Sequence, residues 1–68
     1  MSIKITLAAA RVNAGMTQEE VAKEMKVSKN TIVNIENGKR KIKMAELSFF
    51  SELYKLPKDC FILPNELT

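Results

Sequence analysis

The segment from Thr17 to Gly38 constrains the fold of this chain more than any other. Thr17 and Glu20 have the spacing of a capping box, in which each side chain accepts a hydrogen bond from the other residue's backbone N–H. Ser28 can cap a second helix, and Gly38 is the kind of residue that commonly follows a last helical turn. Between the two expected helices, Lys26–Val27 forms the turn. The segment therefore predicts two short helices joined tightly.

Three more helices are expected around this pair. Thr6 can cap a first helix that runs to about Ala14, and a fourth helix is expected over residues 44–54. Pro57 suits the first position of a short fifth helix, because the proline ring holds φ near the helical value. The residues expected to face the core are Leu7, Ala10, Ala14, Val21, Ala22, Met25, Ile32, Ile35, Met44, Leu47, Phe50 or Ser51, Tyr54, Leu56, Phe61 and Ile62. We therefore expect one all-α domain of five helices over residues 1–64, with residues 65–68 as a tail.

The residue types that most enzymes use are scarce in this sequence. There is no His, and Cys60 is the one cysteine. Zinc sites of the usual kind, Cys-His and Ser-His nucleophile pairs and glycine-rich phosphate loops are therefore not expected. No apolar run approaches the roughly 20 residues that span a bilayer. We therefore expect no enzyme activity, cofactor, metal, small-molecule substrate or membrane contact, and a cytoplasmic location.

The positive charge of the chain is concentrated in one segment. The whole chain carries a net charge of +3. Residues 26–43 hold six basic residues against one acidic residue, a net charge of +5. Residues 1–25 are neutral, with three charges of each sign, and residues 44–68 carry −2 from two basic and four acidic residues. Because the basic segment covers the second helix of the pair, we expect a helix-turn-helix that places this helix in the major groove of double-stranded DNA.

Ile32 and Ile35 are expected to anchor the second helix of the pair, which leaves its other edge to face DNA. The residues expected to contact bases are Lys29, Asn30, Val33 and Asn34. Lysine can donate to guanine, asparagine can pair with adenine, and valine can touch the thymine methyl. The alternative for the two asparagines is ordinary solvated surface, although asparagine has a low helix propensity. The residues expected to contact phosphates are Gln18, Ser28, Asn37, Lys39 and Arg40.

The sequence holds three motifs, A-G-M-T-Q-E-E-V-A, V-S-K-N-T-I and I-E-N-G-K-R. Together they resemble the Cro/C1-type helix-turn-helix family, also called Xre, which includes the lambda-type phage repressors. The resemblance extends over about residues 5–63 and implies a five-helix, lambda-repressor-like domain. It also implies binding to operator DNA, usually as a dimer on a near-palindromic site. Two positions depart from the family pattern, since Lys26 stands where glycine is common and Ile42-Lys43 where Pro-Ser is common.

The resemblance also implies a partner for Arg11, whose charge is unexpected on the inward face of the first helix. In many family members an arginine here pairs with the glutamate of the E-N-G motif, which in this chain is Glu36. We expect a partly buried ion pair, whose disruption would cost about 3–5 kcal/mol if the pair is fully buried. The alternative is that Arg11 contacts a phosphate, in which case its loss weakens DNA binding without destabilising the fold.

One domain presents one recognition helix, so a homodimer is expected on half-sites about 34 Å apart. The surface expected to form the dimer interface consists of Phe49, Glu52, Leu53, Phe61 and Leu63, although Phe49 could equally be a scattered surface residue. These expectations describe a sequence-specific transcriptional regulator, a repressor of the phage or mobile-element kind. The alternative is a protein-interaction module, such as an antitoxin, built on the same fold.

Overall fold

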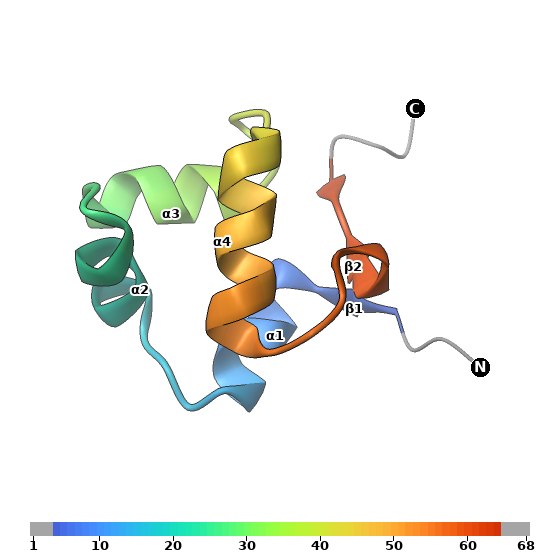
Figure 1. Cartoon of the computed structure of the whole chain (residues 1–68). Helices are drawn as coiled ribbons and strands as arrows, with labels where there is room; N and C mark the ends of the chain where they lie inside the picture. The colour runs from blue at the N-terminus through green and yellow to red at the C-terminus, as the bar shows by residue number, and fades with distance from the viewer. Residues whose placement is uncertain (1–3, 65–68) are drawn as a thin grey trace.

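The computed structural model describes residues 4–64, which form four α-helices, one 3-10 turn and two short strands (Figure 1). The helices are α1 (Leu7–Asn13), α2 (Gln18–Met25), α3 (Lys29–Glu36) and α4 (Met44–Tyr54). The 3-10 turn covers Lys58–Cys60, and the strands are β1 (Ile5–Thr6) and β2 (Phe61–Ile62). The expected helical fold class is confirmed, with four α-helices among the described residues in place of five. The expected tail, residues 65–68, lies outside the described residues.

The first three helices begin at the residues that the sequence predicts. Thr6 Oγ1 accepts from the Ala9 N–H at 3.1 Å, and Ser28 Oγ accepts from the Thr31 N–H at 3.2 Å. At α2 the full capping box forms: Thr17 Oγ1 accepts from the Glu20 N–H at 3.1 Å, and Glu20 Oε1 accepts from the Thr17 N–H at 2.8 Å. These bonds satisfy N–H groups that have no partner inside the helix.

The turn between α2 and α3 is made by a residue in the left-handed conformation. Lys26 has φ 59° and ψ 43°, and the next N–H, that of Val27, donates to the carbonyl of Ala22 at 3.0 Å. Glycine adopts this conformation without strain, whereas a residue with a Cβ pays on the order of 1 kcal/mol. The same conformation recurs at Lys55, which ends α4 with φ 57°.

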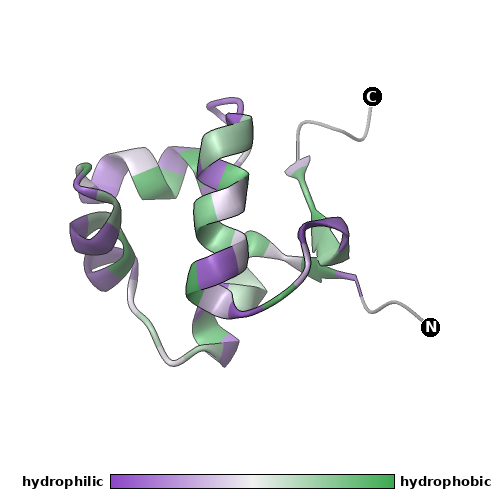
Figure 2. Ribbon diagram, viewed as in Figure 1, coloured by the Kyte–Doolittle hydropathy of each residue, from purple (hydrophilic) through white to green (hydrophobic). Residues whose placement is uncertain are grey.

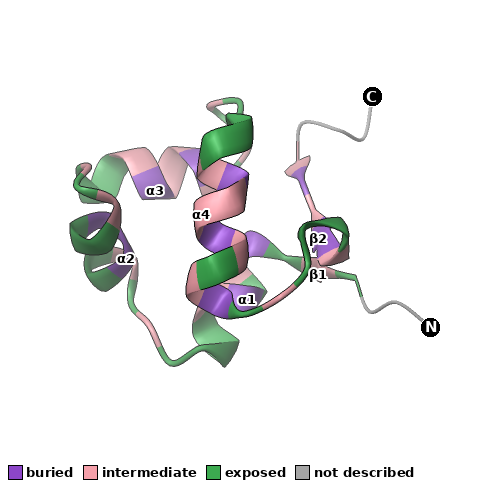
Figure 3. Ribbon diagram, in the orientation of Figure 1, coloured by how far each residue is buried: buried purple, intermediate pink, exposed green. Residues whose placement is uncertain are grey.

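The core is formed by buried side chains from all four α-helices, from β2 and from the residue after β2 (Figure 3). Val21 and Ile32 are fully buried, and Ala22 is buried where α2 and α3 pack together. The outward side of α2 is hydrophilic (Figure 2), so one face of this helix is packed and the other is solvated. The buried residues are Leu7, Ala10, Val21, Ala22, Ile32, Ile35, Leu47, Phe50, Tyr54, Phe61 and Leu63. This core fixes α3 against α2, as a helix-turn-helix requires.

The C-terminal region differs from the sequence-based expectation. The short fifth helix expected at Pro57 is present only as a single 3-10 turn that begins after Pro57, and the chain then enters β2. This strand pairs in parallel with β1, in the register Ile5 with Phe61 and Thr6 with Ile62. Figure 1 shows both strands across α4 from α2 and α3. Pairing with a segment at the other end of the chain supplies the backbone hydrogen bonds that a helix would have supplied locally.

Two residues expected in the core lie on the surface instead. Met44 is 72% exposed because it occupies the first position of α4, beyond the packed part of the helix. Ala14 is exposed because it caps the end of α1, where the chain turns away through Gly15. Met25, Leu56 and Ile62 are half-buried at the edge of the core. The inward stripes are therefore shorter than the sequence suggests.

Candidate nucleic-acid interface

The outward edge of α3 carries the four residues expected to contact bases. Ile32 and Ile35 are at most 1% exposed and anchor the opposite edge of the helix in the core. Lys29 and Asn30 are exposed near the start of α3, while Val33 and Asn34 are half-buried one turn later. Within residues 4–64, the side chains of Lys29, Asn30 and Asn34 form no hydrogen bond. Their donors and acceptors are therefore available to a ligand.

The two ends of α3 hold further polar residues. Ser28 Oγ caps the helix and also shares a hydrogen bond of 3.0 Å with Thr31 Oγ1, so its hydroxyl is partly engaged. Asn37 and Lys39 are exposed after the last turn. The Asn34 carbonyl accepts from the Lys39 N–H at 2.9 Å, which ties the start of the basic run to α3.

Gln18 occupies the first position of α2, and its side chain is held by α3. Its Nε2 donates to Glu36 Oε1 at 3.0 Å. The capping box uses the N–H groups of Thr17 and Glu20, whereas those of Gln18 and Glu19 have no acceptor among residues 4–64. A helix start with open N–H groups attracts anions such as phosphate. The bond from Gln18 to Glu36 was not foreseen, because local sequence pattern does not report contacts between helices.

Arg11 and Glu36 form an ion pair between α1 and the end of α3. Arg11 Nε donates to Glu36 Oε2 at 2.8 Å and Nη2 donates to Oε1 at 3.4 Å. Arg11 Nη1 donates to the Met16 carbonyl at 3.0 Å. The two side chains are 14% and 4% exposed, so the guanidinium has little surface left for a phosphate. The geometry favours a structural role for Arg11 over the alternative of a DNA contact.

The buried hydroxyl of Tyr54 lies within the electrostatic reach of this pair. It has no hydrogen-bond partner among residues 4–64. Burial raises the pKa of Tyr54, the Glu36 carboxylate raises it further, and Arg11 opposes both effects. The phenol is therefore neutral at physiological pH. Its ring stacks on Phe50, with 5.7 Å between the ring centroids, so Tyr54 serves chiefly as a core residue.

A second ion pair engages Arg40, which the sequence assigned to phosphate. Arg40 Nη1 and Nη2 donate to Glu46 Oε1 and Oε2 at 3.0 and 2.8 Å. Glu46 Oε1 also accepts from the Lys43 N–H at 2.9 Å. This is one of the two hydrogen bonds of a capping box, the one that needs the glutamate and no hydroxyl group. The hydrogen bond from Arg40 lowers the pKa of Glu46, against an opposing effect of burial. The pair ties the basic run to the start of α4.

Glu46 was not singled out from the sequence. A signal was present, because Glu46 follows Lys43 by three positions, the spacing at which Glu20 follows Thr17. That spacing indicates a carboxylate at the third position of a helix, though it does not reveal Arg40 as a partner.

Comparison with protein-family models identifies the family of this chain. A family model described as helix-turn-helix matches residues 7–59, which includes all four helices. The chain belongs to the Cro/C1-type helix-turn-helix (Xre) family. This Cro/C1-type protein is therefore a DNA-binding regulator. Searches of the curated proteins and of the solved structures gave no significant match.

Only part of the expected dimer surface of this Cro/C1-type domain is accessible. Phe49 and Leu53 are half-buried and, with the exposed Glu52, line a shallow hollow on α4. Phe61 and Leu63 are only 7% and 6% exposed, because β2 and the residue after it pack into the core. Most of the accessible area of this expected dimer surface therefore lies on α4.

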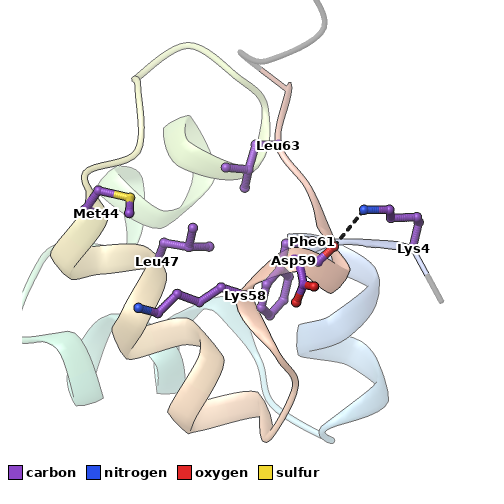
Figure 4. A pocket seen from close by; sticks show the side chains of 7 residues that line it. All are labelled: Lys4, Met44, Leu47, Lys58, Asp59, Phe61 and Leu63. Atoms are coloured by element: carbon purple, nitrogen blue, oxygen red, sulfur yellow. Dashed lines mark hydrogen bonds between the residues drawn. The ribbon is translucent and has the colours of Figure 1, made fainter. Parts of the chain in front are cut away.

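Phe61 and Leu63 instead line a groove of about 390 Å³ between α4 and β2 (Figure 4). Met44 and Leu47 reach the groove from α4, and Lys4 Nζ donates to the Asp59 carbonyl at 2.7 Å at its rim. Among residues 4–64, no group of three or more His, Cys, Asp or Glu side chains is placed to hold a metal ion. None of the described helices is long and apolar enough to cross a membrane.

Proposed function

We propose that this Cro/C1-type regulator is a repressor that reads a near-palindromic operator with α3 in the major groove. The observation that carries the proposal is the outward edge of α3. Its polar side chains make no hydrogen bond within residues 4–64, while Ile32 and Ile35 lock the other edge into the core. A rigid helix with unengaged donors and acceptors suits direct readout of base edges.

Base reading is assigned to the first two turns of α3. Lys29 donates to guanine O6 or N7, and Asn30 and Asn34 each pair with N6 and N7 of an adenine. Val33 contacts a thymine methyl. Lys29 and Asn30 are exposed, whereas Val33 and Asn34 are half-buried. Side chains at the start of α3 therefore extend farther from the domain, so the start of the helix lies deepest in the groove.

Phosphate contacts are assigned to both sides of this helix. Gln18 and the open N–H groups at the start of α2 hold one phosphate, and Ser28 donates nearby. Asn37 and Lys39 hold the strand on the other side. Arg40 contributes through its charge while it remains bridged to Glu46, a role that its ion pair supports better than a dedicated phosphate contact.

A homodimer is proposed to place two α3 helices on half-sites about one helical turn apart. Its interface is centred on Phe49 and Leu53 of α4, flanked by Glu52, with at most the margins of Phe61 and Leu63 added. Repression follows if the operator overlaps a promoter, because a bound dimer excludes other proteins from the same groove. The resemblance to lambda-type repressors supports this sign of regulation.

The test is selection from a randomised duplex library at about 150 mM salt, close to physiological ionic strength. Enrichment of a near-palindrome whose half-sites are one turn apart is the expected result. Retention that is weak, salt-sensitive and indifferent to sequence would overturn the operator assignment. It would favour a protein-interaction role such as that of an antitoxin, for which a partner co-purifying from cells would then be sought.

A further inference from the structure

Three helices converge on the carboxylate of Glu36. Arg11 from α1 donates to both of its oxygens, and Gln18 from α2 donates to Oε1 at 3.0 Å. The Glu36 side chain, at the end of α3, is only 4% exposed. A carboxylate this deeply buried is held in one position by its donors, so it can in turn hold a side chain that reaches the surface.

The bond to Glu36 defines the orientation of the Gln18 amide. An ionised carboxylate only accepts hydrogen bonds, so it selects the nitrogen end of the amide over the oxygen end. Because the amide is planar and carries two N–H groups, fixing one of them also fixes the direction of the other. A surface glutamine without such an anchor would have to give up side-chain freedom, up to about 2 kcal/mol, when it binds a ligand.

The residue that carries this amide also begins α2, where backbone donors are open. The backbone N–H groups of Gln18 and Glu19 have no acceptor among residues 4–64. Arg11 Nη1 also donates to the Met16 carbonyl, immediately before the capping residue of α2. The same network therefore fixes both the side chain of Gln18 and the backbone that presents these N–H groups.

We propose that Glu36 is a positioning residue for DNA binding: it holds the Gln18 amide so that the second N–H of Gln18 and the N–H groups at the start of α2 bind one DNA phosphate together. This inference rests on the proposed function, in which Gln18 contacts phosphate. It gives Glu36 a role in affinity beyond its ion pair with Arg11. Glu36 itself touches no DNA.

The first test is a double-mutant cycle with Gln18→Ala and Glu36→Gln. Binding of the full chain to a fluorescent duplex pool of mixed sequence, about 20 base pairs or two helical turns long, is measured at low salt. Each single variant is expected to weaken binding by about tenfold, the size of a hydrogen bond to a charged group. The double variant is expected to bind no more weakly than either single one.

The matched control is Glu46→Gln, which breaks the other arginine–glutamate pair without touching Gln18. The change in binding caused by Glu46→Gln is expected to be the same in the native chain and in the Gln18→Ala variant. If the losses from Glu36→Gln and Gln18→Ala multiply as well, Glu36 acts through the fold alone and the positioning role is refuted. If the unsubstituted protein shows no salt-sensitive binding to the duplex pool, the proposed function itself has failed.

The second test needs no variant, and it decides the question if Glu36→Gln does not fold. Gln18 is the sole glutamine of the sequence, so its side-chain amide signals in a nitrogen-edited NMR spectrum are readily assigned. One amide proton is expected to be protected from solvent exchange in the free protein, and both are expected to be protected once the duplex pool is added. Equal and rapid exchange of the two protons in the free protein would refute the positioning role. So would a second proton whose exchange is unchanged by DNA.

Discussion

Replacing Arg11 with methionine isolates the energetic cost of the buried ion pair. The substitution keeps an unbranched side chain on α1 and removes the donors to Glu36 and to the Met16 carbonyl. Glu36, at 4% exposure, is then left with Gln18 as its one hydrogen-bond donor among residues 4–64. Breaking one side of a buried pair costs about 3–5 kcal/mol. A domain of this size has a total stability of roughly 3–10 kcal/mol, so the loss is a large part of the whole.

The assay is urea unfolding followed by far-ultraviolet circular dichroism at pH 7 and low temperature. With an m-value of about 1 kcal/mol/M, typical of a small domain, the midpoint of Arg11→Met is expected to fall by about 3 M or more. Arg40→Met serves as the control, because it breaks a pair whose side chains are 33% and 15% exposed. Solvent screens that pair more strongly, so the control is expected to lose less.

The reasoning would be refuted by a loss below about 1 kcal/mol for Arg11→Met, the value typical of an exposed pair. In that event Glu36 would have to be solvated, and the alternative role of Arg11 as a phosphate contact would regain support. The double variant Arg11→Met/Glu36→Leu gives a further check. Removing both charges is expected to recover stability relative to Arg11→Met, because no buried charge is then left uncompensated.

Of four further predictions, two concern DNA binding, one the turn and one pH. Asn34→Ala is expected to cost about 1–3 kcal/mol on the selected operator and nothing on random DNA, measured by anisotropy; an equal loss on both would contradict its base contact. Lys39→Ala is expected to weaken binding to every sequence and to reduce the salt slope by about one unit. Lys26→Gly is expected to raise the free energy of unfolding by up to about 1 kcal/mol, because glycine relieves the left-handed strain at φ 59°; a loss in urea unfolding would contradict this. Arg40 holds the pKa of Glu46 below its ordinary value of 4.5, so the ionised carboxylate stabilises the fold above that value and the contribution is lost as pH falls through the lowered pKa. The gap in urea midpoint between the native chain and Glu46→Gln is therefore expected at pH 7 and to shrink below about pH 4; a gap independent of pH would exclude this linkage.

Local signals predicted the helix-turn-helix well. Thr17 with Glu20 and Ser28 with Thr31 each form their cap within a few residues, so the information needed lies in one short stretch of sequence. The periodic pair Ile32 and Ile35 likewise defines the buried edge of α3, and by elimination its outward edge. The buried edge of this helix could therefore be inferred without a structure, whereas the half-buried state of Val33 and Asn34 on the other edge could not.

What the sequence did not predict depends on contacts between distant segments. Pro57 is compatible both with a helix start and with the extended conformation that it adopts before the 3-10 turn. The choice was decided by β1, which lies at the other end of the chain. The bonds from Gln18 to Glu36 and from Arg40 to Glu46 likewise join separate elements, and no spacing rule on a single helix encodes them.

The pairing of β1 with β2 also bears on the order in which parts of the domain open and close. Joining Ile5 to Phe61 closes a loop of about 55 residues, whose entropy cost is about 3–4 kcal/mol. That cost is offset by a strand pair of only two residues on each side and by the burial of Phe61 and Leu63. By contrast, α2 and α3 are neighbours in sequence and close a short turn. Brief openings that release the strands while α2 and α3 stay folded are therefore expected to cost less than openings that separate α2 from α3. The backbone amides of β2 are expected to exchange with solvent sooner than those of α3. We therefore expect α3 to stay folded when the two ends of the chain separate.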